Sequence, residues 1–168
     1  MPFQLIESIY RQHRQGFFTL ALSITGCRLA AEDAVHQSLT RLNDSLLADK
    51  QDAVAFVYRC VRNASIDAHR RRRNQNSVAE TIFNGFLPPP AAKFDNPDSR
   101  ILTAERDQIL RQAIDELAGN TREIVLLKTF SGLTFAQIGN VLDIPPKTAA
   151  TQYRRALQTL HEKLKGQL

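Results

Sequence analysis

The densest positive charge of the chain lies in a block of arginines in its first half. Residues 59–73 contain six arginines and one aspartate, for a net charge of +5. Residues 145–168 contain five lysines and arginines and one glutamate, for +4, whereas the whole chain carries a formal net charge of +5. Guanidinium and ammonium groups pair with phosphate, so two separate basic blocks predict a polyanion that is bound at two places. The alternative is a pair of solvated helix faces.

The first basic block combines arginines with aromatic side chains. Arg59, Arg62, Arg70 and Arg73 recur at steps that place them in one broad stripe of a helix, and Phe56 and Tyr58 lie directly before them. Such a stripe can follow the phosphates of a strand while aromatic rings stack on unpaired bases. Cations are also favourable at a helix C-terminus, but this effect accounts for only one or two of the arginines.

The second basic block contains a helix-turn-helix pattern. Thr134 followed by Gln137 predicts a capping box, Gly139 is small where two helices approach, and Pro146 suits the first position of the second helix. A helix with a polar N-terminal half fits the major groove, where glutamine can pair with adenine and arginine with guanine. The outward positions are Lys147, Thr148, Thr151, Gln152, Arg154 and Arg155. The alternative is an ordinary helical hairpin.

The other reactive side chains lack the spacing of an active site. The four histidines are scattered, and the chain has neither a Cys/His metal pattern nor a glycine-rich phosphate loop. Glu32, Asp33 and His36 could be drawn as a metal site, but no further ligand is identifiable. We therefore expect no enzyme, no metal and no cofactor. Two cysteines and the absence of a signal peptide or a long apolar run predict a cytoplasmic protein without membrane insertion.

Hydrophobic periodicity predicts an all-α fold, because residues recur at helical steps and strand patterns are nearly absent. Helices are expected over residues 3–24, 31–46, 53–73, 101–119, 121–130, 134–142 and 146–164. Residues 74–99 hold four of the seven prolines, three of them consecutive, which favours an extended segment. The prediction is two small helical domains, 1–73 and 100–168, joined by a proline-rich linker over 74–99.

Three segments, in this order and spacing, carry a resemblance to a known family. They are AEDAVHQSLTRL (31–42), FVYRCVRNASIDAHRRRR (56–73) and the stretch from Ala113 to Leu164 that contains the helix-turn-helix pattern. Over nearly its whole length the chain resembles a bacterial extracytoplasmic-function (ECF, group 4) RNA polymerase sigma factor of the sigma-70 family. The resemblance implies a three-helix domain similar to sigma region 2 and a helix-turn-helix domain similar to region 4.

The same resemblance implies a function and site residues. It implies a promoter-specificity subunit that binds core RNA polymerase at the β′ clamp helices and the β flap, recognises double-stranded and melted promoter DNA, and performs no catalysis. An anti-sigma factor is a further partner in many relatives. Core-polymerase binding is implied for Asp33, Gln37, Leu39 and Arg41. Recognition and melting of the −10 element are implied for Phe56, Tyr58, Arg59, Arg62, Asn63, Asp67, Arg70 and Arg71. Recognition of the −35 element is implied for Lys147, Thr148, Thr151, Gln152, Arg154 and Arg155.

The chain departs from the family pattern at four positions. His36 replaces the more usual apolar or polar residue before Gln37. Phe56 stands where the family often has tryptophan, and Ala150 and Gln152 stand where it often has cations. The alternative function is a helix-turn-helix transcriptional regulator that binds duplex DNA without polymerase. Such regulators usually dimerise on two half-sites. No heptad seam for a dimer is visible in this sequence, and the alternative leaves the basic block at 59–73 without a purpose.

Overall fold

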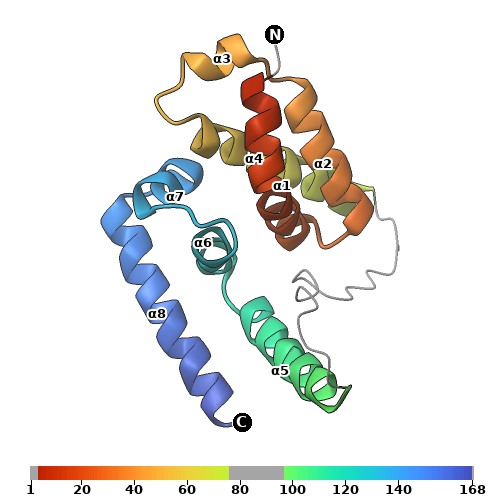
Figure 1. The fold of residues 1–168 in the computed structure, drawn as a ribbon, viewed down its shortest axis with the longest axis vertical. Helices are drawn as coiled ribbons and strands as arrows, with labels where there is room; N and C mark the ends of the chain where they lie inside the picture. The colour runs from red at the N-terminus through yellow and green to blue at the C-terminus, as the bar shows by residue number, and fades with distance from the viewer. Residues whose placement is uncertain (1–3, 76–96, 168) are drawn as a thin grey trace.

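Helices make up the described part of the chain. The computed structural model describes residues 4–75 and 97–167, with only the backbone over 97–104. The predicted linker lies outside these residues except at its two ends. The helices are α1 (Gln4–Thr25), α2 (Arg28–Thr40), α3 (Asp44–Ala48), α4 (Ala53–Asn74), α5 (Pro97–Asp115), α6 (Gly119–Thr129), α7 (Phe135–Leu142) and α8 (Pro146–Lys165) (Figure 1). The all-α prediction is confirmed. None of the described helices is long and apolar enough to cross a bilayer.

The N-terminal half, α1 to α4, is built on the mutual packing of α1, α2 and α4. Both predicted ends of the second helix are wrong, because it begins at Arg28 rather than Ala31 and does not continue to Leu46. The chain leaves the helix after Thr40, and Asn43 starts the short α3 by accepting a hydrogen bond from the backbone N–H of Leu46 at 2.7 Å. An asparagine side chain offers the backbone this alternative to a continuous helix.

The basic helix α4 agrees with the predicted range of 53–73. Asp52 caps its first turn, with a carboxylate oxygen 2.9 Å from the backbone nitrogen of Ala55. Val57, Tyr58 and Val61 are fully buried on one side of the helix. The apolar side of α4 therefore fixes which of its polar residues face outward.

The C-terminal half, α5 to α8, contains the predicted helix-turn-helix. The capping box of α7 is confirmed, because the Thr134 hydroxyl accepts from the Gln137 N–H and the Gln137 side chain accepts from the Thr134 N–H. A Cβ on Gly139 would lie 2.6 Å from the carbonyl oxygen of Ile144, so glycine permits the close approach there. Asp143 turns the chain with φ of 56°. In addition, α5 begins at Pro97 rather than near Ile101, and so extends into the predicted linker.

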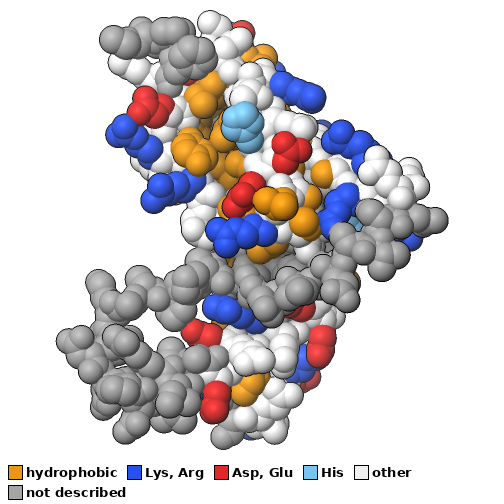
Figure 2. All heavy atoms as spheres, turned by 90° about the vertical axis from the view of Figure 1, so that its right-hand side faces the viewer, with side chains coloured by type: hydrophobic (Ala, Val, Ile, Leu, Met, Phe, Trp, Pro, Cys, Tyr) orange, Lys and Arg blue, Asp and Glu red, His pale blue; other side chains and the backbone are white. Residues whose placement is uncertain are grey.

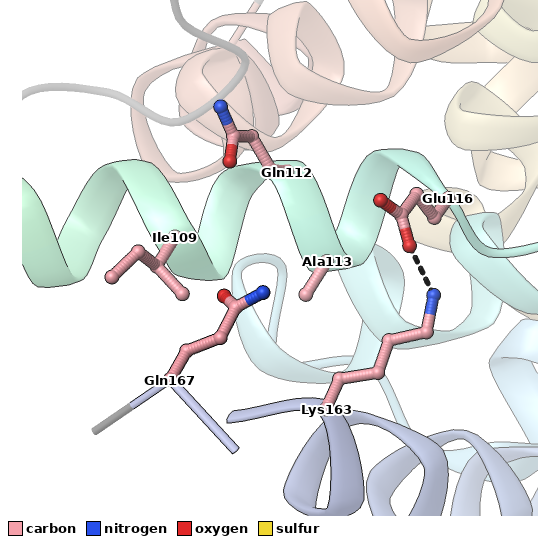
Figure 3. Close-up of a pocket in the computed structure, with 6 residues that line it drawn as sticks. All are labelled: Ile109, Gln112, Ala113, Glu116, Lys163 and Gln167. Carbon is pink, nitrogen blue, oxygen red and sulfur yellow. Dashed lines mark hydrogen bonds and ion pairs between the residues drawn. The ribbon is translucent and has the colours of Figure 1, made fainter. Parts of the chain in front are cut away.

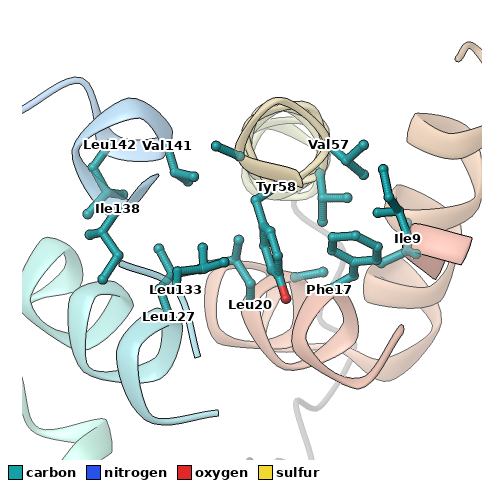
Figure 4. Packing of buried hydrophobic residues seen from close by; sticks show 14 of the residues in the cluster. Ile9, Phe17, Leu20, Val57, Tyr58, Leu127, Leu133, Ile138, Val141 and Leu142 are labelled. Atoms are coloured by element: carbon teal, nitrogen blue, oxygen red, sulfur yellow. The ribbon is translucent and has the colours of Figure 1, made fainter. Parts of the chain in front are cut away.

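The two halves share one hydrophobic core, which the sequence did not predict. α6 packs against α1 and α7 packs against α4, far apart in the sequence but side by side in Figure 1. Leu127 and Leu133 of the C-terminal half lie next to Leu20 of α1, beside the ring of Tyr58 (Figure 4). A smaller second cluster joins α5, α6 and α8 around Ile114 and Leu126. The described residues therefore form one packed body.

The shared core predicts that both halves unfold together. Leu127→Ala removes a fully buried side chain from it, and we expect a loss of about 2–5 kcal/mol in the free energy of unfolding. Chemical denaturation followed by circular dichroism measures this loss, in a single transition that includes both halves. Leu29→Ala, at a side chain that is 76% exposed, is the control and should change the free energy by less than about 0.5 kcal/mol. Two separate transitions, of which only one shifts, would contradict the shared core.

Candidate nucleic-acid interface

The described residues offer surfaces rather than an enclosed active site. Among residues 4–75 and 105–167, no group of three His, Cys, Asp or Glu side chains lies close enough to hold a metal ion. A hollow of about 170 Å³ between α5 and α8 is lined by Gln112 and Gln167 and crossed by the Lys163–Glu116 ion pair (Figure 3). Because this hollow is small and open, we consider the larger surfaces on α1–α2, α4 and α8.

The first surface is a groove between α1 and α2. It has a volume of about 400 Å³, and Figure 2 shows hydrophobic side chains on this face of the molecule with charged groups around them. Val35, His36 and Leu39 line it from α2. Its opposite wall comes from α1 and was missed by the sequence analysis, although its members recur at four-residue steps and helical periodicity could have found them. They are Tyr10, Arg14 and Phe18.

The residues with an implied polymerase-binding role lie on α2 or at its C-cap, and of the four only Leu39 lines this groove. Asp33 and Gln37 are one turn apart on α2, and the Gln37 amide donates to the Asp33 carboxylate at 2.9 Å. Leu39 lines the groove, and Arg41 is exposed at the C-cap of α2. The α2 helix thus presents a polar pair beside an apolar wall, a combination that suits the docking of another helix.

The second surface is an exposed stripe on α4. Arg59, Asn63, Asp67 and Arg70 follow one another at steps of four, four and three residues, and each is exposed. Arg71 is exposed beside this stripe. Phe56 is half-buried, with the Lys50 ammonium 4.7 Å from the centre of its ring. We call Arg59, Asn63, Asp67 and Arg70 the α4 stripe. The α4 stripe contains two guanidinium groups, one carboxylate and one amide, and the amide can contact a base.

Tyr58, which the resemblance places in the −10 contact, is fully buried in this arrangement. Its ring lies 4.5 Å from that of Phe17, and its hydroxyl is 3.1 Å from Nδ1 of His13. Burial raises the pKa of Tyr58 to about 12, against a smaller opposing effect of the nearby Ser131 hydroxyl. A Cβ on Gly16 would lie 2.1 Å from the Tyr58 hydroxyl and 2.6 Å from the Ser131 hydroxyl. Gly16 is therefore the point where α1 approaches the α6–α7 turn.

Arg62 is the second −10 candidate that faces the protein interior. Its Nε donates to Oε2 of Glu123 at 2.6 Å, and the two side chains are only 19% and 9% exposed. Burial raises the pKa of Glu123, while the hydrogen bond and the charge of Arg62 act in the opposite direction. The sequence analysis did not single out Glu123. It lies in an otherwise apolar stretch, EIVLL, and its buried position could be inferred only from that context.

The third surface is the N-terminal half of α8. Lys147, Arg154 and Arg155 are exposed, whereas Thr148, Thr151 and Gln152 are half-buried. The fully buried Ala149 and the contact between the Phe135 and Tyr153 rings, whose centres are 5.7 Å apart, hold α8 on α7. The structure therefore keeps all six predicted −35 residues on one helix and none of them fully buried.

Family models match both halves of the chain. The model described as "Sigma-70 region 2" matches residues 9–75, which include α2 and α4. The model described as "Sigma-70, region 4" matches residues 107–160, which include the helix-turn-helix. Both models describe regions of one protein family, and together they cover most of the chain.

Curated relatives and one solved structure match along nearly the whole chain. The ECF RNA polymerase sigma factor SigL of Mycobacterium tuberculosis is 27% identical over 160 residues, which are 93% of this chain and 86% of SigL. The ferric citrate uptake sigma factor FecI of Escherichia coli is 24% identical over 90% of this chain and 86% of its own. The sigma factor RpoE of Bartonella quintana, solved with the anti-sigma factor NepR, has a TM-score of 0.67 at 18% identity over 95% of this chain and 96% of its own. This likeness supports the fold.

The partial burial of His13 predicts a pH dependence of stability. Burial lowers the pKa of His13 below its ordinary 6.5, so the unfolded chain binds a proton more readily than the folded chain does. The contribution of His13 is therefore complete above about pH 6.5 and falls as the pH is lowered towards the folded pKa. We expect His13→Gln to lose less unfolding free energy than the wild type between pH 7.5 and 5.5. His161→Gln, at an exposed position of α8, is the control, and an equal pH dependence in wild type and His13→Gln would contradict the prediction.

Proposed function

The chain belongs to the sigma-70 family, in its group of ECF RNA polymerase sigma factors, and on this premise we propose how it serves as a promoter-specificity subunit. The α1–α2 groove binds core RNA polymerase at the β′ clamp helices, and the C-terminal half meets the β flap. The α4 stripe contacts the −10 element and assists its melting, and α8 reads the −35 element. The observation that supports this most is the presence, in one chain, of an exposed basic stripe and a capped helix-turn-helix.

The two nucleic-acid surfaces differ in the form of DNA that they suit. The N-terminal half of α8 keeps Lys147, Arg154 and Arg155 exposed, and a helix with such a face can enter the major groove of a duplex, where base edges are distinguishable. The α4 stripe has guanidinium groups for phosphates and an amide for a base edge, and the half-buried ring of Phe56 precedes it on the same helix. This combination suits a single strand with unstacked bases. This division assigns duplex recognition to α8 and capture of a melted strand to α4.

Polymerase-bound sigma factors provide specificity and the core enzyme provides the chemistry, so we assign no catalytic residue and no cofactor to this chain. The cytoplasm is the proposed location because the polymerase works there. An anti-sigma factor is a proposed further partner. The matched RpoE structure contains one, and the open apolar groove between α1 and α2 gives such a protein a surface to cover.

The assignment of the α1–α2 groove predicts that Gln37→Ala weakens binding to core polymerase. We expect Gln37 to belong to the minority of interface residues whose truncation costs more than about 1 kcal/mol, which corresponds to about fivefold or more in Kd. Gel filtration with sigma-free core polymerase, with a housekeeping sigma factor as competitor, measures the complex. Gln158→Ala is a matched control, because the Gln158 amide also donates to a carboxylate one turn away, that of Glu162 at 3.3 Å.

Two outcomes would contradict this assignment. Equal loss of binding in Gln37→Ala and Gln158→Ala would show that Gln37 of α2 makes no specific contact with the polymerase. Failure of the wild-type chain to bind an active, sigma-free core from a close relative, together with tight binding to a palindromic duplex, would favour the stand-alone helix-turn-helix regulator instead.

The assignment of α8 predicts different effects for its amide and its lysine. Gln152→Ala should relax the preference at one base pair by about 1–3 kcal/mol, because a glutamine amide can discriminate base edges. Lys147→Ala should weaken binding to all sequences and reduce the salt slope by about one, because an ammonium group contacts phosphate. Enrichment of random duplexes by the reconstituted holoenzyme, followed by salt titration, measures both effects. The reverse pattern would show that Lys147 discriminates bases and that Gln152 does not.

A further inference from the structure

The closed packing of the two halves covers one side of the nucleic-acid helix α4. α7 lies along α4, and α6 places Glu123 against Arg62. Arg62 is consequently withdrawn from the surface, as is Tyr58, whose ring also packs on Phe17 of its own half. The α4 stripe and the cations in the N-terminal half of α8 remain exposed. The covered and accessible residues of α4 belong to the same segment, so the packing divides one proposed binding surface into an open part and a closed part.

Arg62 lies at the border between these two parts. It follows Arg59 by three residues and precedes Ile66 by one turn, so its side chain leaves the helix between the buried face of Tyr58 and Val61 and the exposed stripe. In the absence of α6, a side chain at this angle would extend the α4 stripe by one cation. The closed arrangement instead holds this guanidinium against the C-terminal half.

The Glu123 carboxylate, which pairs with Arg62, resembles a phosphate as a negatively charged hydrogen-bond acceptor. A guanidinium presents N–H donors in a planar array that matches the oxygens of a carboxylate and those of a phosphate equally. The Glu123 carboxylate receives the Arg62 Nε–H at 2.6 Å in a largely desolvated position. A buried carboxylate of this kind is costly without its partner. The pair is therefore formed only while the halves are packed, since parting them exposes both groups to water.

We propose that Glu123 is an internal substitute for a nucleic-acid phosphate. It holds Arg62 in the closed arrangement, and a phosphate of the DNA strand displaces it when α6 moves away from α4. The proposal rests on the proposed function, because it takes α4 as a nucleic-acid contact. It makes Arg62 a cation that becomes available late, after the exposed α4 stripe and α8 have made their contacts.

The DNA-binding test compares Glu123→Gln with the wild type on a fluorescein-labelled single-stranded oligonucleotide, by fluorescence anisotropy over a range of salt concentrations. Release of Arg62 should raise the affinity several-fold and steepen the plot of log Kobs against log[salt] by about 0.7, the value for one further phosphate contact on a single strand. The double variant Arg62→Gln/Glu123→Gln should lose this gain. Glu7→Gln is the matched control, because it changes the net charge equally and breaks the exposed Arg11–Glu7 pair, in which Arg11 is already accessible.

Closure is tested separately and without DNA. Glu123→Arg places a second guanidinium against Arg62, so the halves should part. Small-angle X-ray scattering of the full chain should then give a radius of gyration above that of the wild type, which compact packing places at about 15 Å. Circular dichroism establishes that the helices are retained. If Glu123→Arg loses its helices, the same scattering measurement on the wild type tests the opening. Its radius of gyration should then increase when the oligonucleotide is added.

The outcomes separate this proposal from the proposed function. A steeper salt plot for Glu123→Gln that disappears in the double variant supports the substitution of phosphate by Glu123. An unchanged plot, or an equal gain in Glu7→Gln, overturns it. A helical Glu123→Arg variant that stays as compact as the wild type overturns the role of the ion pair in closure. If no variant binds DNA while Glu123→Arg expands, the role of α4 in the proposed function fails but the closing ion pair stands.

Discussion

The packing of α6 and α7 against α1 and α4 is the constraint on which the rest of the structure depends. A helical unit of about seventy residues buries only about 60% of the surface that its unfolded chain exposes, so each half alone has little core to stabilise it. Joining the halves lets Leu127, Leu133 and Ile138 complete a core with Phe17 and Leu20. Polar groups drawn into that interface need partners. Arg62 therefore meets Glu123 across the interface, while the Tyr58 hydroxyl meets His13 of its own half.

That constraint gives the three proposed binding surfaces different degrees of availability. The α1–α2 groove and the N-terminal half of α8 lie away from the interface between the halves, so both can accept a partner without rearrangement. α4 borders the interface and presents only one of its sides. A chain that needs α4 for a melted strand thereby couples nucleic-acid binding to its own domain packing, because the same side chains cannot serve both contacts at once.

The helix-turn-helix shows how a stable frame leaves its contact residues free to vary. The capping box, the left-handed turn at Asp143 and the close approach at Gly139 all depend on the backbone and its hydrogen bonds. None of them depends on Ala150 or Gln152, where the chain departs from the family pattern. The departures therefore change the chemistry of the outer face and leave its geometry intact. Fewer cations and one amide favour base discrimination over phosphate attraction.

Local features of this chain followed from the sequence without any knowledge of the fold. Helical periodicity and hydrogen bonds within a few residues set the range of α4, the capping box of α7 and Pro146 at the start of α8. They also set the exposure of Arg59, Arg70, Lys147, Arg154 and Arg155. The end of α2 was missed because the apolar spacing of Leu42 and Leu46 also fits a continuous helix, and Asn43 interrupts it. The contacts of Tyr58, Arg62 and Glu123 could not be inferred, because partners 61 residues apart, such as Arg62 and Glu123, meet only once the halves pack. Interactions between residues close in the sequence thus determine the helices. The packing of α4 against elements distant in the chain determines which of its sides faces solvent.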